Sequence, residues 1–132
     1  MVMNLVKVSS TSAKYQQDIT INDKFQLIAD EPLYLGGDDA GATPVELLIA
    51  ALGSCKAITL RMYAERKDWD LTGVEVNLTH QKSDRQYHII ANLKLTGNLT
   101  EDQRQRLLKI ADKCPVHKLL QAQTPIETIL VD

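Results

Sequence analysis

The longest run of apolar positions in the chain extends from Thr43 to Arg66. Apolar residues recur there every three or four positions, which is the spacing of one face of an α-helix. The stripe at this spacing consists of Leu48, Leu52, Cys55, Thr59 and Met62. Most other positions of the run are apolar as well, and a helix that is apolar on nearly all sides is expected to be buried on most of them. The pattern therefore predicts a long central helix.

Two threonines mark predicted helix starts. Thr43 is followed by Pro44, which suits a first helical turn, and by Glu46 three residues later. Thr100 is followed in the same way by Gln103. Each pair has the spacing of a capping box, in which the two side chains bond each other's backbone amides. One helix should therefore begin after Thr43 and a second after Thr100.

Alternation of apolar and polar residues predicts strands on both sides of the long helix. The predicted strands are Met3–Ser9, Gln16–Ile21, Lys24–Ala29, Leu71–His80, Tyr87–Leu95 and Pro125–Val131. Asn22-Asp23 fits a tight hairpin turn, and Ser83–Gln86 fits a second turn. A third, shorter helix should run from Pro115 to about Gln121, with Cys114 at its N-cap.

Runs of strands separated by runs of helices are typical of the α+β class. We therefore expect a single domain over residues 1–132, with antiparallel sheet packed on the long central helix. Six short strands from one chain hardly suffice to cover a helix that is apolar on most sides. Because burying the spare face is favourable, at ~25 cal/mol per Å², we expect a homodimer with these helices near the interface.

Composition narrows the function classes. The chain has 132 residues, with 44% hydrophobic and 24% charged residues and a net charge of −2. This charge balance gives no reason to expect a nucleic acid or an anionic membrane as a partner. The first ten residues do not resemble a signal peptide, and the apolar run is too interrupted to span a bilayer. We expect a cytoplasmic protein.

The candidate chemistry lies in the two cysteines, Cys55 and Cys114. The positive end of a helix dipole at an N-cap can stabilise a Cys114 thiolate. Cys55 lies among apolar neighbours in mid-helix, where burial alone raises a thiol pKa, so its activation needs a cation from elsewhere in the fold. Lys56 is adjacent but points about 100° away around the helix. The other candidate cations are Lys14, Arg85 and Lys118. The plain alternative is a pair of buried free thiols.

His117 follows Cys114 by three residues, which places both on one face of the short helix. Such a pair is half of a zinc site that His80, His88 and Cys55 would have to complete, although the sequence contains no second close pair. The same residues also fit a Cys–His pair for acyl transfer. The remaining interpretation is an ordinary half-exposed histidine on a helix.

Two segments carry a resemblance to a known family. Residues 42–55, ATPVELLIAALGSC, resemble the central-helix motif of the OsmC/Ohr family, and residues 111–118, ADKCPVHK, resemble its second-cysteine motif. The similarity is greater to the OsmC-like branch with a Cys-Pro-x-His-Lys motif than to the dedicated organic hydroperoxide reductases. The predicted order of elements fits the family over essentially the whole chain.

The resemblance implies a thiol-dependent peroxidase for organic hydroperoxides, with a role in oxidative or osmotic stress defence. Cys55 would match the peroxidatic cysteine and Cys114 the resolving cysteine that forms a disulfide with it. A small or lipoyl-type dithiol would reduce that disulfide, and no metal or cofactor is implied. The family fold is an intertwined α+β homodimer with active sites at the subunit interface.

Two positions depart from the reductase pattern. The reductases use an arginine from the N-terminal strands, whereas no arginine precedes Arg61 here, and Lys14 is the nearest basic substitute. Their glutamate directly follows the helix proline, where this chain has Val45, with Glu46 one residue later. The supporting residues considered are Lys14, Glu46, His117 and Lys118. The alternative function is a non-catalytic protein that binds a small apolar ligand at the dimer interface.

Overall fold

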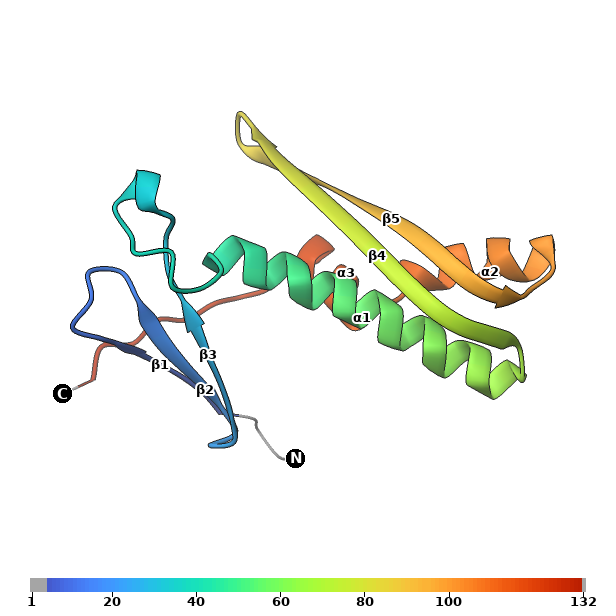
Figure 1. The fold of residues 1–132 in the computed structure, drawn as a ribbon, viewed down its shortest axis with the longest axis horizontal. Coiled ribbons are helices and arrows are strands. Elements are labelled where there is room, and N and C mark those ends of the chain that lie inside the picture. The colour runs from blue at the N-terminus through green and yellow to red at the C-terminus, as the bar shows by residue number, and fades with distance from the viewer. Residues whose placement is uncertain (1–4, 132) are drawn as a thin grey trace. The chain divides into compact units, whose positions relative to one another are not determined.

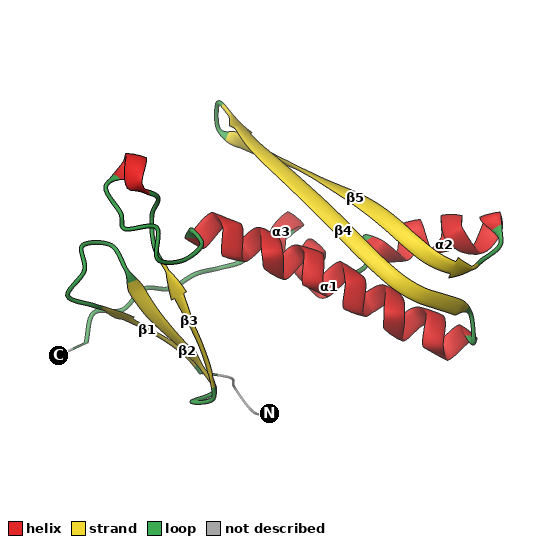
Figure 2. Ribbon diagram, in the orientation of Figure 1, coloured by secondary structure: helices red, strands yellow, loops and turns green. Residues whose placement is uncertain are grey.

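The computed structural model describes residues 5–131, and its helices and strands are shown in Figures 1 and 2. In chain order they are β1 (Val6–Ser10), β2 (Gln17–Ile21), β3 (Phe25–Ala29), η1 (Leu33–Leu35), α1 (Pro44–Lys67), β4 (Asp70–Ser83), β5 (Gln86–Asn98), α2 (Glu101–Ala111) and α3 (Pro115–Gln121). Both sheets are antiparallel, which confirms the α+β class. No helix within residues 5–131 is long and apolar enough to cross a membrane.

The chain divides after Ala50 into two compact units. The first unit holds the three-stranded sheet β1-β2-β3, and the second holds the β4–β5 hairpin with α2 and α3. Helix α1 begins in the first unit and ends in the second. The single domain expected over residues 1–132 stays a prediction.

The sheet of the first unit depends on the tight turn between β2 and β3. Asn22 and Asp23 have φ angles of 56° and 52°, and the amide of Lys24 donates to the carbonyl of Ile21 at 3.1 Å. Two consecutive left-handed residues define the hairpin turn that matches strand twist, so the prediction at Asn22-Asp23 is confirmed. Strand β1 begins at Val6, and the first two residues of the predicted strand from Met3 lie outside the described residues.

The loop between β3 and α1 is organised by a buried carboxylate. Asp30 is 2% exposed and accepts hydrogen bonds from the amides of Glu31 at 2.7 Å, Asp38 at 3.2 Å and Ala40 at 3.1 Å. These bonds hold the pKa of Asp30 below its ordinary value, with that from Ala40 as the largest cause. The loop between β3 and α1 is thus held in place by hydrogen bonds to the carboxylate of Asp30.

Helix α1 begins at the predicted capping box. The amide of Thr43 donates to Oε1 of Glu46 at 2.9 Å, and the amide of Glu46 donates to Oγ1 of Thr43 at 3.2 Å. The second box is also present, because the amide of Thr100 donates to Gln103 at 2.9 Å and the amide of Gln103 to Thr100 at 3.1 Å. Both predicted helix starts are therefore confirmed.

The buried side of α1 differs from the predicted stripe. From Leu52 onward, the helix buries residues that are four positions apart, namely Leu52, Lys56, Leu60 and Ala64. Two members of the predicted stripe are exposed, Leu48 at 43% and Met62 at 59%. The predicted stripe did not include Lys56, whereas the structure buries this charged residue. The prediction of this face was wrong because a lysine can be buried where it finds enough acceptors.

The second unit has a core between α1, α2 and the β4–β5 hairpin (Figure 1). Its buried members are Leu60, Ala64, Leu71, Leu107, Ile110 and Ala111. In the hairpin, Val74 pairs with Leu95 and Val76 with Leu93, and all four side chains are half-buried on one face. The alternation predicted for these two strands is confirmed, and it directs one face of the hairpin toward the helices.

The C-terminal segment departs from the prediction. Residues Pro125–Val131 contain no strand, and several of their apolar side chains are exposed, Ile126 at 86% and Leu130 at 99% among them. Alternation supplies one apolar face, but a strand also needs a neighbouring edge with which to pair. Within the described residues the pairs are β1–β2, β2–β3 and β4–β5. The closing strand was therefore wrongly predicted for the single chain.

Candidate active site

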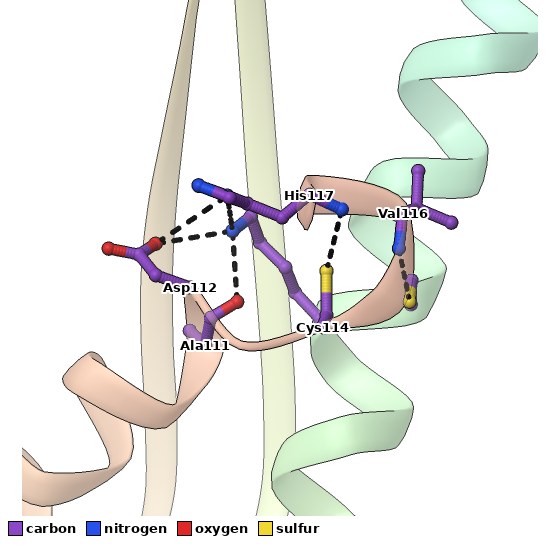
Figure 3. A network of polar contacts seen from close by, with 7 residues as sticks. Ala111, Asp112, Cys114, Val116 and His117 are labelled. Atoms are coloured by element: carbon purple, nitrogen blue, oxygen red, sulfur yellow. Dashed lines mark hydrogen bonds and ion pairs between the residues drawn. The ribbon is translucent and has the colours of Figure 1, made fainter. Parts of the chain in front are cut away.

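The second unit brings the two cysteines together. Cys55 is half-buried in the middle of α1, and Cys114 is completely buried directly before α3. The two thiols are close enough that Cys55 contributes to the raised pKa of Cys114. The amide of Val116 donates to Sγ of Cys55 at 3.5 Å, and that of His117 donates to Sγ of Cys114 at 3.3 Å (Figure 3). The start of α3 thus places one amide on each sulfur.

The local sequence explains this placement. Cys114 has the extended backbone of an N-cap, with φ −66° and ψ 144°, and Pro115 occupies the first turn of α3. An N-cap side chain turns back to accept from the amide three residues later, and here the thiol takes the role that serine or aspartate usually has. The N-cap predicted for Cys114 is confirmed.

The surroundings of Cys114 raise the pKa of its thiol. Burial is the largest cause, and the neighbouring sulfur of Cys55 adds to it. The amide of His117 and the positive charge of Lys56 act in the opposite direction. The environment therefore favours the neutral thiol at Cys114, while the more accessible sulfur belongs to Cys55.

Lys56 is the charged group that the fold brings to this pair. It is 5% exposed, and its Nζ lies 3.0 Å from the carbonyl of Ala111, 3.4 Å from Oδ1 of Asp112 and 2.9 Å from Nδ1 of His117. An ammonium group has three N–H donors, so every donor meets one acceptor. The ammonium has no lone pair, so Nδ1 of His117 must be the acceptor in their hydrogen bond. The proton of the neutral ring therefore lies on Nε2.

Asp112 and His117 complete the polar network around Lys56 (Figure 3). Nδ1 of His117 is 3.7 Å from Oδ1 of Asp112, an ion pair only when the histidine is protonated. The side chain of Asp112 is 70% exposed, so solvent weakens its attraction to either neighbour. The carbonyl of Ala111 and the imidazole are therefore the principal partners of the ammonium.

The sequence interpretation passed over Lys56 because its side chain leaves the helix in a different direction from that of Cys55. The long side chain nevertheless reaches the turn between α2 and α3, which also carries Cys114. One sequence signal pointed to it, since Lys56 is the only charged residue between Glu46 and Arg61. A lone charge within a stretch destined for burial requires dedicated partners.

The other residues named from the sequence have different surroundings. Lys14 lies in the first unit with its Nζ 5.1 Å from the ring centroid of Tyr15. Glu46 caps α1, as its spacing from Thr43 predicted. Lys118 is exposed on α3, and Arg85 is exposed in the turn between β4 and β5. Their roles toward the thiols stay predictions.

The alternatives built on His117 gain no support from its contacts. Cys114 receives the backbone amide of His117, whereas the imidazole bonds to Lys56 instead of acting as a base on that sulfur. Among residues 5–131, no group of three or more histidine, cysteine, aspartate or glutamate side chains is arranged to hold a metal ion.

Comparison with known proteins points to one family. The family model described as OsmC-like protein matches residues 36–129, a range that includes α1 and both cysteines. No curated protein matches the chain.

Several solved structures have the same fold. A protein of Psychrobacter arcticus 273-4, provisionally assigned as an osmotic stress induced and detoxification response protein, is similar with a TM-score of 0.77 and 19% identity, over 90% of this chain and 89% of that chain. The organic hydroperoxide resistance protein OsmC of Legionella pneumophila has a TM-score of 0.68 and 18% identity, over 92% of this chain and 90% of that chain. The organic hydroperoxide resistance protein OhrB of Bacillus subtilis has a TM-score of 0.63 and 20% identity, over 91% of each chain.

Proposed function

Because the chain belongs to the OsmC-like protein family, we propose that it is a thiol-dependent peroxidase that reduces organic hydroperoxides. The observation that carries the proposal is the convergence of the Cys55 and Cys114 sulfurs at the start of α3, where two consecutive backbone amides donate one to each sulfur. A peroxidase of this kind needs one sulfur that a substrate can reach and a second within bonding range of the first. Two proteins with this fold are named for organic hydroperoxide resistance, which supports the same substrate class.

The proposed reaction has two chemical steps in the protein. The Cys55 thiolate attacks one oxygen of the hydroperoxide, an S–O bond forms, the O–O bond breaks, and the alkoxide takes up a proton to leave as an alcohol. The sulfur of Cys114 then attacks that of Cys55, an S–S bond forms, and the S–O bond breaks. The departing hydroxyl leaves as water with the proton from Cys114. An external dithiol reduces the disulfide and is oxidised in turn.

The roles of the two cysteines follow from their accessibility. Cys55 is half-buried and accepts a hydrogen bond from the amide of Val116. Cys114 is fully buried and has a raised pKa, so it suits a thiol that waits for an intramolecular partner. Cys55 is accordingly the peroxidatic residue and Cys114 the resolving residue.

Titration of the reduced protein with cumene hydroperoxide tests the proposal. One equivalent should convert the two thiols to an intramolecular disulfide, seen as the loss of two hydrogens in the mass of the non-reduced protein. Cys55→Ser should abolish consumption of the hydroperoxide, while Cys114→Ser should accumulate a sulfenic acid at Cys55 that dimedone traps. Free thiols that persist under excess hydroperoxide would instead favour the non-catalytic ligand-binding alternative.

A further inference from the structure

Lys56 occupies a position that is costly for a charged group. Its ammonium is withdrawn from water, and an unpaired buried charge destabilises a fold by several kcal/mol. The three acceptors described above offset this cost. All three belong to Ala111, Asp112 and His117, which flank Cys114 on both sides along the chain. One side chain of α1 therefore binds the segment immediately before and the segment immediately after the second cysteine.

The placement of the charge also concerns the chemistry. The Lys56 ammonium favours the anionic form of Cys114, in opposition to burial and to the neighbouring Cys55 thiol. Cys114 must lose its proton before its sulfur attacks Cys55, because a thiolate is the attacking species in thiol exchange. A fixed cation near the sulfur stabilises this thiolate, and its position requires no reorganisation when the proton leaves.

We propose that Lys56 is the positioning residue of the resolving step, holding the Cys114 segment against Cys55 and stabilising the Cys114 sulfur as it becomes anionic. This inference rests on the peroxidase function proposed above. The titratable groups that face the reaction are Cys55 and Lys56 on α1, Asp112 in the turn after α2, and His117 on α3. Among them, Lys56 is the buried cation whose contacts hold both segments that flank Cys114, and its charge lowers the pKa of that thiol.

Two substitutions separate charge from packing. Lys56→Met keeps the length of the aliphatic chain and removes the charge, whereas Lys56→Arg keeps the charge. Lys113→Met is the matched control, because Lys113 precedes Cys114 directly but is exposed. Stopped-flow measurement with cumene hydroperoxide should show that Lys56→Met leaves sulfenic acid formation at Cys55 within about twofold but slows disulfide formation about tenfold. Lys56→Arg should recover most of that rate, and Lys113→Met should match the unmodified protein.

A second readout needs no peroxide. In a Cys55→Ser background, the reaction of Cys114 with methyl methanethiosulfonate should follow the Cys114 thiolate. Loss of the Lys56 charge should move the pH midpoint of this reaction upward, a shift that a packing role alone would not cause. If Lys56→Met does not fold, Lys56→Gln serves instead, since it retains a donor for Ala111 and lacks the charge.

The outcomes distinguish the two proposals. Absence of any Cys55–Cys114 disulfide in the unmodified protein would overturn the peroxidase function. A normal disulfide in the unmodified protein, together with equal resolving rates and equal pH midpoints in Lys56→Met or Lys56→Gln, would overturn only the role of Lys56.

Discussion

At the scale of single residues, the two thiols differ through their surroundings. Cys114 is withdrawn from water and sits beside a second thiol, and both circumstances favour its neutral form. Cys55 remains half-accessible and receives an amide from the start of α3. Burial is the largest cause of the raised pKa of Cys114, while the amide of His117 and, to a smaller extent, Lys56 limit the rise.

This difference predicts the order of modification by iodoacetamide at neutral pH. Cys55 should be alkylated at least about tenfold faster than Cys114, since Cys114 is fully buried and the pKa of its thiol is raised. Peptide mass mapping of samples quenched at successive times measures the two rates. Denatured protein is the control, because both cysteines should then react alike. Faster labelling of Cys114 in the folded protein would contradict the assignment of the accessible sulfur.

A second residue-scale prediction concerns Asp30. Its pKa in the folded protein lies below its pKa in an unfolded chain. The carboxylate therefore stabilises the fold fully at pH values above the unfolded-state pKa, and this contribution is lost as the pH falls through the folded-state pKa. The amides of Asp38 and Ala40 should therefore keep their NMR shifts at mildly acidic pH and change together only below about pH 4.

The variant Asp30→Asn provides the control for that titration, since its side chain has no proton to gain. Its Asp38 and Ala40 amide shifts should show no common titration step in the same range. If the unmodified protein instead titrated above the ordinary pKa of an aspartate, the bonding scheme of this loop would be incorrect.

At the scale of elements, short-range signals decide where the helices begin. Thr43 with Glu46 and Thr100 with Gln103 form reciprocal boxes within four residues, so each needs no help from the rest of the fold. The side of α1 that faces the core is a different matter, because it depends on where α2 and the hairpin pack.

Thr100→Ala should lower the free energy of unfolding by about 1 kcal/mol, because the amide of Gln103 loses its acceptor at the start of α2. Urea denaturation followed by circular dichroism measures the change. Gln105→Ala on the same helix is the control, since its side chain bonds Glu101 only on an exposed surface, a contact worth a few tenths of a kcal/mol. Equal losses in both variants would argue against the capping role.

At the scale of the whole molecule, the described chain leaves apolar surface uncovered. Ile58 and Met62 on α1 are 57% and 59% exposed, and the C-terminal segment exposes Ile129 and Leu130 as well. Burying such surface against a second copy is favourable, so we expect the homodimer that the apolar helix indicates.

Sedimentation equilibrium at micromolar concentration should therefore give the mass of a dimer. A chain that ends at Gln123 should dissociate at concentrations at least about tenfold higher, because it loses the exposed apolar side chains of the C-terminal segment. Its helical circular dichroism should be retained, since the core of the second unit lies before that point. A purely monomeric full-length protein would contradict the expected assembly.

Most of the fold could be predicted from the sequence because its signals are local. The capping boxes, the Asn22-Asp23 turn, the N-cap at Cys114 and the alternation of the hairpin all arise from residues that are close neighbours along the chain. Steric preference and short hydrogen bonds are sufficient to specify them. The two cysteine motifs likewise identified the residues that meet in the site.

Only the tertiary structure decided which side of α1 is buried, what Lys56 binds, and whether residues 125–131 pair. Each depends on atoms far away along the chain: Lys56 needs Ala111 and His117, and a strand needs an edge. Hydropathy predicts that a lysine lies at the surface, whereas Lys56 is buried because three hydrogen-bond acceptors surround its ammonium. Local sequence thus determined the elements, and the packing of distant segments determined the electrostatics of the thiol pair.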